Sequence, residues 1–233
     1  MEVGQYYLAP YTYYPLAVEE QKDLTKETLI FYSDKYMDNT DGLINGKTPN
    51  ALCIPLPKGV KAKKGDILLT WWQTGSGLQR AIVTDASAPN APTVCYLDLN
   101  YEGNGRGFAE RYANQQIKPN SFLVLKDGQL MSGAPIAYFE EGEWKSGKCV
   151  NATNDKVLVL AWGDKVCAVD KSNVKVLPLK PKFKVGESVM AEFVDSYCEG
   201  YTVTKIDKSI GRVWVKKGSS EKILSIFEVT KPL

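Results

Sequence analysis

Short runs of apolar and β-branched residues recur along the whole chain, separated by clusters of glycine, proline, asparagine and aspartate. Four clear runs cover residues 66–72, 92–97, 156–162 and 211–216. Their length and their content of Val, Ile, Tyr, Trp and Thr are typical of β-strands bounded by turns. Convincing helical periodicity over about eleven residues is hard to find. The pattern therefore predicts a nearly all-β protein.

One pattern recurs four times: a turn glycine, a strand, a second strand with a small or polar residue, and a third strand. The glycine and the small residue are 16 positions apart in three copies and 13 apart in the first. The distance from the small or polar residue to a position just past the third strand is 17 residues in two copies and 15 in the other two. A repeated β-module explains this spacing. The markers are Gly4, Ala17 and Asp34; Gly65, Ala81 and Asp98; Gly133, Cys149 and Asp164; and Gly186, Thr202 and Lys217.

The repeat predicts four small barrels, with three as the alternative, and the four lie at residues 1–57, 58–127, 128–179 and 180–233, which we name units 1 to 4. Short linkers near 55–59, 126–128 and 178–181 connect them, and proline limits the freedom of such segments. A domain of roughly 60 residues buries only about 60% of its unfolded surface. We therefore expect adjacent units to pack against each other as a semi-rigid array.

The chain contains no histidine, which excludes Ser/His/Asp and Cys/His nucleophile systems and histidine-containing metal sites. Its five cysteines are widely spaced and mostly lie in apolar runs, so we predict free, buried thiols and a reducing compartment. Possible nucleophiles have no sequence-local partner that would activate them. We predict a non-enzymatic protein with no cofactor and no metal site.

No apolar run approaches the roughly 18 residues of a membrane helix, and the first residues lack the features of a signal peptide. The expected location is intracellular, cytoplasmic by default, without a membrane partner. Charge changes along the chain, from −4 over residues 1–57 to +4 over residues 174–233. The basic unit 4, through Lys216 and Lys217, gives one alternative function: a nucleic-acid binder whose exposed rings stack on bases. A solvated lysine-rich surface is the simpler interpretation of these charges.

In units 1 to 3 the third strand ends with an aromatic residue, any residue and Asp. Residues 94–100 resemble the Tudor-domain signature, in which Val, an aromatic residue and Asp are followed by an aromatic residue, Gly and Asn. Residues 183–193 and 201–206 resemble the first two strands of the Tudor, Agenet and chromo-barrel group. The likeness departs from the pattern at Leu99, which replaces the second aromatic residue, and at Lys217, which replaces the acid of unit 4.

The resemblance implies tandem SH3-like, Tudor-like barrels of about five strands, whose mouths often carry an aromatic cage for methylated lysine or arginine. Aromatic faces attract such a cation by roughly 0.5–2 kcal/mol, and a carboxylate adds a charge-assisted contact. Unit 4 has rings at Phe193, Tyr197 and Tyr201 but no matching acid. The candidate ligand-binding residues are Tyr11, Tyr14, Tyr32 and Asp34 in unit 1; Trp71, Trp72, Tyr96 and Asp98 in unit 2; and Phe139, Trp144, Trp162 and Asp164 in unit 3.

The leading hypothesis is thus a binding module for a peptide or protein segment, with a methylated lysine or arginine as its candidate side chain. The same rings could instead form core or packing between units, because strand alternation sends half of them inward. Trp71 and Trp72 are adjacent, so they must point to opposite faces of a regular strand. A second alternative is therefore a structural scaffold in which the rings pack against each other and no barrel mouth is open.

Overall fold

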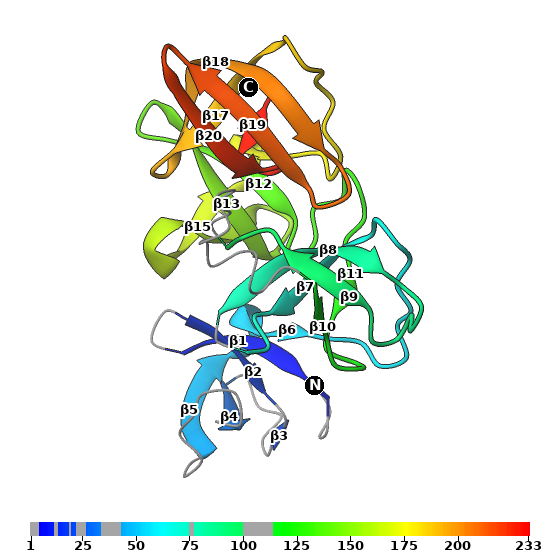
Figure 1. The fold of residues 1–233 in the computed structure, drawn as a ribbon. Coiled ribbons are helices and arrows are strands. Elements are labelled where there is room, and N and C mark those ends of the chain that lie inside the picture. The colour runs from blue at the N-terminus through cyan, green and yellow to red at the C-terminus, as the bar shows by residue number, and fades with distance from the viewer. Residues whose placement is uncertain are drawn as a thin grey trace.

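The computed structural model describes residues 5–11, 14–18, 20–21, 27–33, 43–74, 77–99 and 114–233, and the side chains of residues 9–50 are not described. The described chain is nearly all β, with several antiparallel sheets and short 3-10 helices, as predicted (Figure 1). The strands β7 (Ile67–Trp71), β9 (Thr93–Tyr96), β14 (Lys156–Leu160) and β19 (Arg212–Lys217) lie within or closely match the four apolar runs. Within these described ranges, no helix is long and apolar enough to cross a membrane.

The remaining strands follow in chain order. Residues 5–55 contain β1 (Tyr7–Tyr11), β2 (Tyr14–Val18), β3 (Glu20–Gln21), β4 (Glu27–Ser33), β5 (Leu43–Pro49), the 3-10 helix η1 (Asn50–Leu52) and β6 (Ile54–Pro55). Next come β8 (Leu78–Asp85), β10 (Gln115–Gln116), β11 (Leu123–Val124), β12 (Pro135–Glu140), β13 (Glu143–Ala152), η2 (Trp162–Asp164), β15 (Val166–Asp170), η3 (Lys171–Asn173) and β16 (Val174–Val176). The last are β17 (Ser188–Phe193), β18 (Ser196–Asp207), β20 (Ser220–Ser225) and β21 (Val229–Thr230).

Units 2, 3 and 4 share one strand order, in which the first four strands form a meander and the fifth pairs with the first. The orders are β11-β7-β8-β9-β10, β16-β12-β13-β14-β15 and β21-β17-β18-β19-β20. In unit 1 the strands form two sheets, β6-β1-β2 and β3-β4-β5. The recurring order supports a repeated module, while the boundaries of the four units stay a prediction.

The turn glycines that mark the repeat make the same backbone contact in units 2, 3 and 4. Each has a φ between 85° and 89°, in the left-handed region that glycine adopts at low cost. Each amide donates to a carbonyl of the second strand at 2.7–2.9 Å, and a β-bulge begins at that acceptor residue. Such a bulge bends the strand sharply. The donor and acceptor pairs are Gly65 and Val83, Gly133 and Cys149, and Gly186 and Val203. Gly4 lies outside the described residues.

One hydrophobic cluster contains residues from all four predicted units. It includes Leu8 of unit 1, Leu69 of unit 2, Leu160 of unit 3 and Val213 of unit 4. Strands β13 and β18 also pair at one position and thereby join the strands of units 3 and 4 into a ten-stranded sheet. Figure 1 shows the N-terminal strands at one end of the molecule and β17 to β20 at the other.

The cysteines are free thiols, and three of them are buried, in agreement with the prediction. Burial raises the pKa of Cys53 to about 12 and that of Cys149 to about 11. These two thiols are therefore protonated at neutral pH and are poor nucleophiles. Across the described part of the chain, no group of three or more Cys, Asp or Glu side chains is arranged to hold a metal ion.

Candidate functional site

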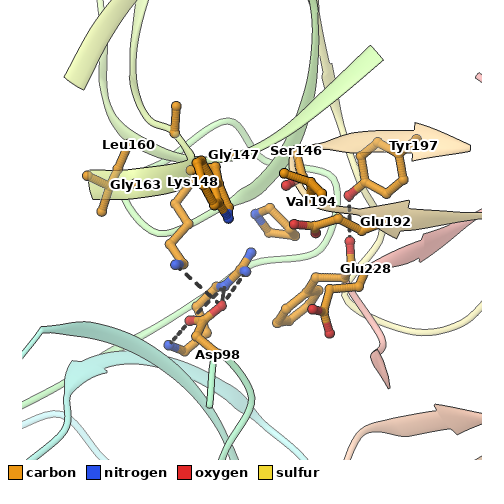
Figure 2. Close-up of a pocket in the computed structure, with 15 residues that line it drawn as sticks. Asp98, Ser146, Gly147, Lys148, Leu160, Gly163, Glu192, Val194, Tyr197 and Glu228 are labelled. Atoms are coloured by element: carbon orange, nitrogen blue, oxygen red, sulfur yellow. Dashed lines mark hydrogen bonds and ion pairs between the residues drawn. The ribbon is translucent and has the colours of Figure 1, made fainter. Parts of the chain in front are cut away.

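A polar cleft of about 350 Å³ lies where units 2, 3 and 4 meet (Figure 2). Unit 2 contributes residues from β8 and from the segment just after β9. Unit 3 contributes residues from β12, β13, β14 and η2, and unit 4 contributes residues from β17, β18 and the turn before β21. The cleft thus depends on packing between units. Its lining residues are Arg80, Asp98, Pro135, Ser146, Gly147, Lys148, Leu160, Ala161, Trp162, Gly163, Glu192, Val194, Tyr197, Phe227 and Glu228.

A buried ion pair forms the unit 2 side of the cleft. The Nε of Arg80 donates to Asp98 Oδ1 at 3.1 Å, and its backbone amide donates to Asp98 Oδ2 at 2.6 Å. The guanidinium carbon of Arg80 lies 4.3 Å from the ring centroid of Phe227, and Lys148 Nζ is 3.6 Å from Asp98 Oδ1. Burial alone would raise the pKa of Asp98, but the Arg80 charge, aided by that of Lys148, holds it at about 2. Asp98 is therefore an ionised carboxylate whose charge is already compensated.

Two further carboxyl groups on the unit 4 side have pKa values that are raised, because burial outweighs the nearby positive charges. Burial and the charge of Glu228 raise the pKa of Glu192 to about 7. Burial also raises the pKa of Glu228, which accepts a hydrogen bond from the Ser225 amide. Figure 2 shows Glu192 and Glu228 on the same side of the cleft, near Tyr197. Tyr197 is held in place because its hydroxyl donates to the Phe227 carbonyl at 2.6 Å.

Trp162 forms an exposed wall of the cleft. It lies in η2, two residues beyond the end of β14, and 61% of its surface is exposed. The next residue, Gly163, has a φ of 70°, which permits the tight turn here. An exposed indole and a carboxyl group that ionises near neutral pH therefore line one open cleft. This combination can attract a cation through the ring face and through charge.

In unit 2, the structure places Trp71 and Tyr96 in the interior, away from the predicted open rim. Trp71 is 2% exposed, and its ring centroid is 5.2 Å from that of Tyr6. The Tyr96 hydroxyl donates to Gln115 Oε1 at 2.8 Å. Trp72 is half-buried and packs against a different hydrophobic cluster from Trp71. The two tryptophans therefore point to opposite faces, as the alternation predicted.

The three rings predicted in unit 3 occupy two different places. Phe139 is 42% exposed and contacts Trp144 near the end of the β12–β13 hairpin, with ring centroids 5.3 Å apart. The face of Trp144 already holds a cation of the same chain, because Lys175 Nζ lies 4.4 Å from its centroid. Trp162 instead lines the cleft between units.

The other predicted residues cannot be assigned to a site. Tyr11, Tyr14 and Tyr32 lie in β1, β2 and β4, and Asp164 lies in η2, but their side chains are outside the described part of the structure. Asp34 lies outside the described residues altogether. Among the predicted residues with described side chains, the cleft brings together Asp98 and Trp162.

Several lining residues were not predicted, because they come from different units and share no local motif. The recurring aromatic-x-Asp pattern marks strand ends within a unit, whereas the charges of the cleft meet only when three units pack. An acid within an apolar strand, such as Glu192 among Val, Met, Ala and Phe, was the one available signal. The unpredicted polar and aromatic lining residues are Arg80, Ser146, Lys148, Glu192, Tyr197, Phe227 and Glu228.

Comparisons with known proteins identify no family. No protein-family model matches the chain, and no curated protein matches it. One solved structure that matches is the crystal structure of Arabidopsis thaliana AGDP1 AGD34, at 18% sequence identity and a TM-score of 0.27. The match covers 44% of this chain and 82% of that chain. A likeness of this size establishes neither a shared fold nor a shared function.

Proposed function

We propose that the chain is a non-enzymatic binding module with four barrel units, and that the cleft between units 2, 3 and 4 takes a cationic side chain of a peptide or protein segment. The observation that carries this proposal is the exposed ring of Trp162 in the same cleft as Glu192. Glu192 provides a counter-charge as it ionises near pH 7, whereas Asp98 is already held in a direct ion pair with Arg80. Because this cleft is open, it favours a ligand site over the alternative of a structural scaffold whose rings only pack against each other.

A methylated lysine or arginine is the preferred side chain for physical reasons. Trimethyl-lysine keeps its positive charge but has no N–H donors and holds water less strongly than an ammonium group. Moving this group from water onto an indole face therefore costs less desolvation free energy than moving an ammonium group. The ring contact contributes about 0.5–2 kcal/mol. An ion pair with a partly exposed carboxylate adds about 0.2–1 kcal/mol. The expected affinity is that of a weak, reversible reader of a modified segment.

The proposal makes binding depend on pH. With its pKa near 7, Glu192 is largely protonated at pH 6 and largely ionised at pH 8. A cation that pairs with this carboxylate therefore binds more tightly as the pH rises through 7. A cation held by the ring alone would bind equally well at both values. The variant Glu192→Gln removes the titration and serves as the control for this dependence.

The test is a calorimetric titration of matched peptides that carry lysine, trimethyl-lysine or dimethyl-arginine. The wild type is compared with Trp162→Ala and with Phe139→Ala, which removes an exposed ring outside the cleft. We expect Trp162→Ala to weaken binding of a methylated peptide about two- to thirtyfold, and Phe139→Ala to leave it unchanged. Negligible binding of every peptide to the wild type would reject the proposal.

A second candidate function, nucleic-acid binding by unit 4, rests on a different surface. Strand pairing places Trp214 beside Lys205 of β18, and Lys205 Nζ lies 4.2 Å from the Trp214 ring centroid. Lys216 is exposed, while Lys217 Nζ donates to the Glu199 carbonyl at 2.9 Å. Such a face would bind single strands by stacking and by phosphate contacts. Its test is the slope of affinity against salt for an oligonucleotide, which Lys216→Glu and Lys217→Glu should each reduce.

A further inference from the structure

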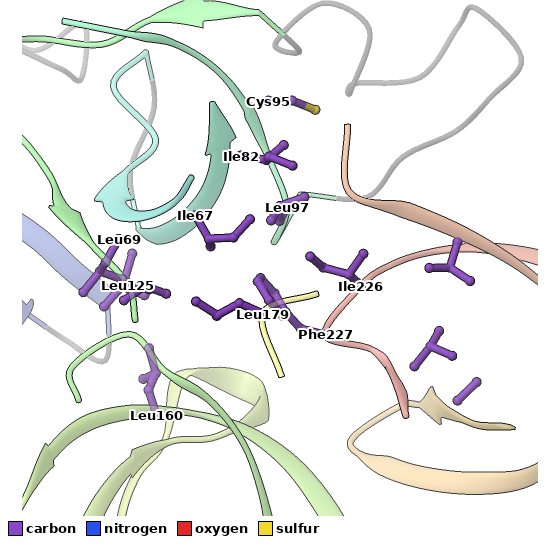
Figure 3. Close-up of a cluster of buried hydrophobic side chains, with 14 of the residues drawn as sticks. Ile67, Leu69, Ile82, Cys95, Leu97, Leu125, Leu160, Leu179, Ile226 and Phe227 are labelled. Atoms are coloured by element: carbon purple, nitrogen blue, oxygen red, sulfur yellow. The ribbon is translucent and has the colours of Figure 1, made fainter. Parts of the chain in front are cut away.

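A second cleft, of about 560 Å³, lies between units 2 and 4 and has an aliphatic floor. Its walls come from the start of β7, from β8, from the linker at 179–181 and from the turn between β18 and β19. Figure 3 shows Ile67, Leu179 and Ile226 approaching one another from separate segments of the chain. No aromatic ring lines this cleft among the described residues. The aliphatic lining residues are Ile67, Ile82, Leu125, Leu179 and Ile226, all of them buried.

Three lysines from three separate segments surround this floor. Lys64 precedes β7, Lys180 lies in the linker, and Lys208 lies in the β18–β19 turn. All three are exposed, and none is in an ion pair with a carboxylate of the described chain. Three positive charges thus converge on an apolar cleft with no ion-pair partner.

The two aspartates in the walls are engaged by the backbone. Asp66 Oδ2 accepts the Lys63 amide at 2.8 Å, and Asp127 Oδ1 accepts the Leu179 amide at 2.7 Å. These bonds fix both carboxylates at turns, where they do not pair with the three lysines. The three lysines outnumber these two aspartates, so the cleft keeps one surplus positive charge at its rim, above a floor of aliphatic side chains.

We propose that this cleft binds a small amphiphilic anion, with an alkyl chain on the aliphatic floor and its anionic head among the three lysines. The volume lies within the roughly 300–1,000 Å³ of small-molecule sites, which are mostly apolar with a few charged groups. An aliphatic floor suits an alkyl chain and offers no stacking surface for a base. This site is independent of the cleft that contains Trp162.

The proposal predicts separate contributions from the chain and the head. Each methylene moved from water to the floor should raise affinity about fourfold, so decanoate should bind more tightly than hexanoate. Reversal of one lysine charge should lower affinity about fivefold. Added salt should weaken binding of decanoate without affecting a neutral alcohol of the same length.

The experiment is a calorimetric titration of hexanoate, octanoate, decanoate, decyl phosphate and decanol into the full chain, below the micellar concentration of each. The variants are Lys180→Glu and Lys208→Glu, with Lys171→Glu, an exposed lysine in η3, as the matched control. We expect affinity to rise with chain length, to fall in both cleft variants and to stay unchanged in the control. Comparison of decanoate with decyl phosphate identifies the preferred head.

A second measurement locates the ligand. Decanoate should shift the methyl NMR signals of Ile67 and Ile226, while those of Val157 in the core of unit 3 should stay in place. Equal binding of decanol and decanoate would overturn the proposal, because the lysines would then play no part. Equal affinity of hexanoate and decanoate, or no shift at Ile67 and Ile226, would also overturn it.

Discussion

Arg212 Nη2 donates a hydrogen bond to the carbonyl of Tyr96 at 2.6 Å, although 116 residues separate the two. The same nitrogen donates to the Leu99 carbonyl at 3.0 Å, and Nη1 donates to the Leu97 carbonyl at 3.3 Å. A buried guanidinium at the start of β19 thus holds the backbone on both sides of Asp98. Unit 4 thereby fixes the position of the Arg80–Asp98 pair in the cleft.

Replacement of Arg212 by Met should destabilise the protein. The Arg212→Met variant leaves three carbonyls of the segment 96–99 without this donor, and hydrogen bonds from a charged group contribute about 1.5–3 kcal/mol each. We expect a loss of at least about 3 kcal/mol in the free energy of unfolding, measured by urea denaturation. Lys216→Met, on the same strand but exposed, is the control and should change stability by less than about 0.5 kcal/mol. Equal stability of both variants would show that the contact between units is not stabilising.

A methyl group at Gly211 should disrupt the same interface. A Cβ at Gly211 would lie 2.7 Å from Leu97 Cδ2, and its φ of +64° is already unfavourable for alanine. Gly218 has a similar φ of +61° but open space around its Cβ position, so Gly218→Ala isolates the backbone effect. We expect Gly211→Ala to lose about 1–3 kcal/mol more than Gly218→Ala in thermal or urea unfolding. Equal losses would mean that Leu97 moves aside without cost.

The Arg80–Asp98 pair should be sensitive to removal of one partner. Asp98→Asn leaves the buried Arg80 charge uncompensated and should cost about 3–5 kcal/mol. Asp170→Asn breaks an exposed pair with Lys156 and should cost less than about 1 kcal/mol. Because the pKa of folded Asp98 is lowered to about 2, the wild type should lose stability as the pH falls from about 4 to 2. Urea denaturation at pH 7 and pH 3 checks both expectations.

Glu192 should give the opposite pH dependence. Its pKa in the folded protein is about 7, above the 4.5 of an unperturbed glutamate, so the folded state keeps a proton that the unfolded chain releases. Stability from this group is therefore present below pH 4.5 and is lost as the pH rises through 7, by about 3 kcal/mol in total. Glu192→Gln should be more stable than the wild type at pH 8, whereas the exposed variant Glu199→Gln should match the wild type at each pH. A flat difference between Glu192→Gln and the wild type would exclude the raised pKa.

The fold class and the turn glycines of units 2 to 4 could be predicted because both depend on local sequence. Turn glycines such as Gly65 and Gly133 have positive φ values that few other residues tolerate. Their spacing in the sequence therefore indicates where the same turn recurs. The alternation of side chains along a strand similarly predicted opposite directions for Trp71 and Trp72. Alternation could not decide which of the two is buried, because Trp71 is covered by residues of other units such as Tyr6.

The candidate site could be predicted only in part. Asp98 and Trp162 each end a strand in a recurring pattern, and both line the cleft. Their neighbours there, Arg80 and Glu192, come from different units and approach only when the units pack. Sequence patterns within one unit therefore predicted Asp98 and Trp162 but not Arg80, whose charge compensates that of Asp98. In the proposed function, Glu192 instead supplies the counter-charge for the ligand.

NMR of the tryptophan indole groups tests the central claim most directly. The chain has five tryptophans and hence five indole N–H signals, and Trp162→Phe identifies the signal of Trp162. Titration with a trimethyl-lysine peptide at pH 8 should shift the Trp162 signal in a saturable way and leave that of the buried Trp71 in place, with a smaller effect in Glu192→Gln. A stationary Trp162 signal, or a saturable shift confined to the other tryptophans, would contradict the proposal that this cleft binds the cation.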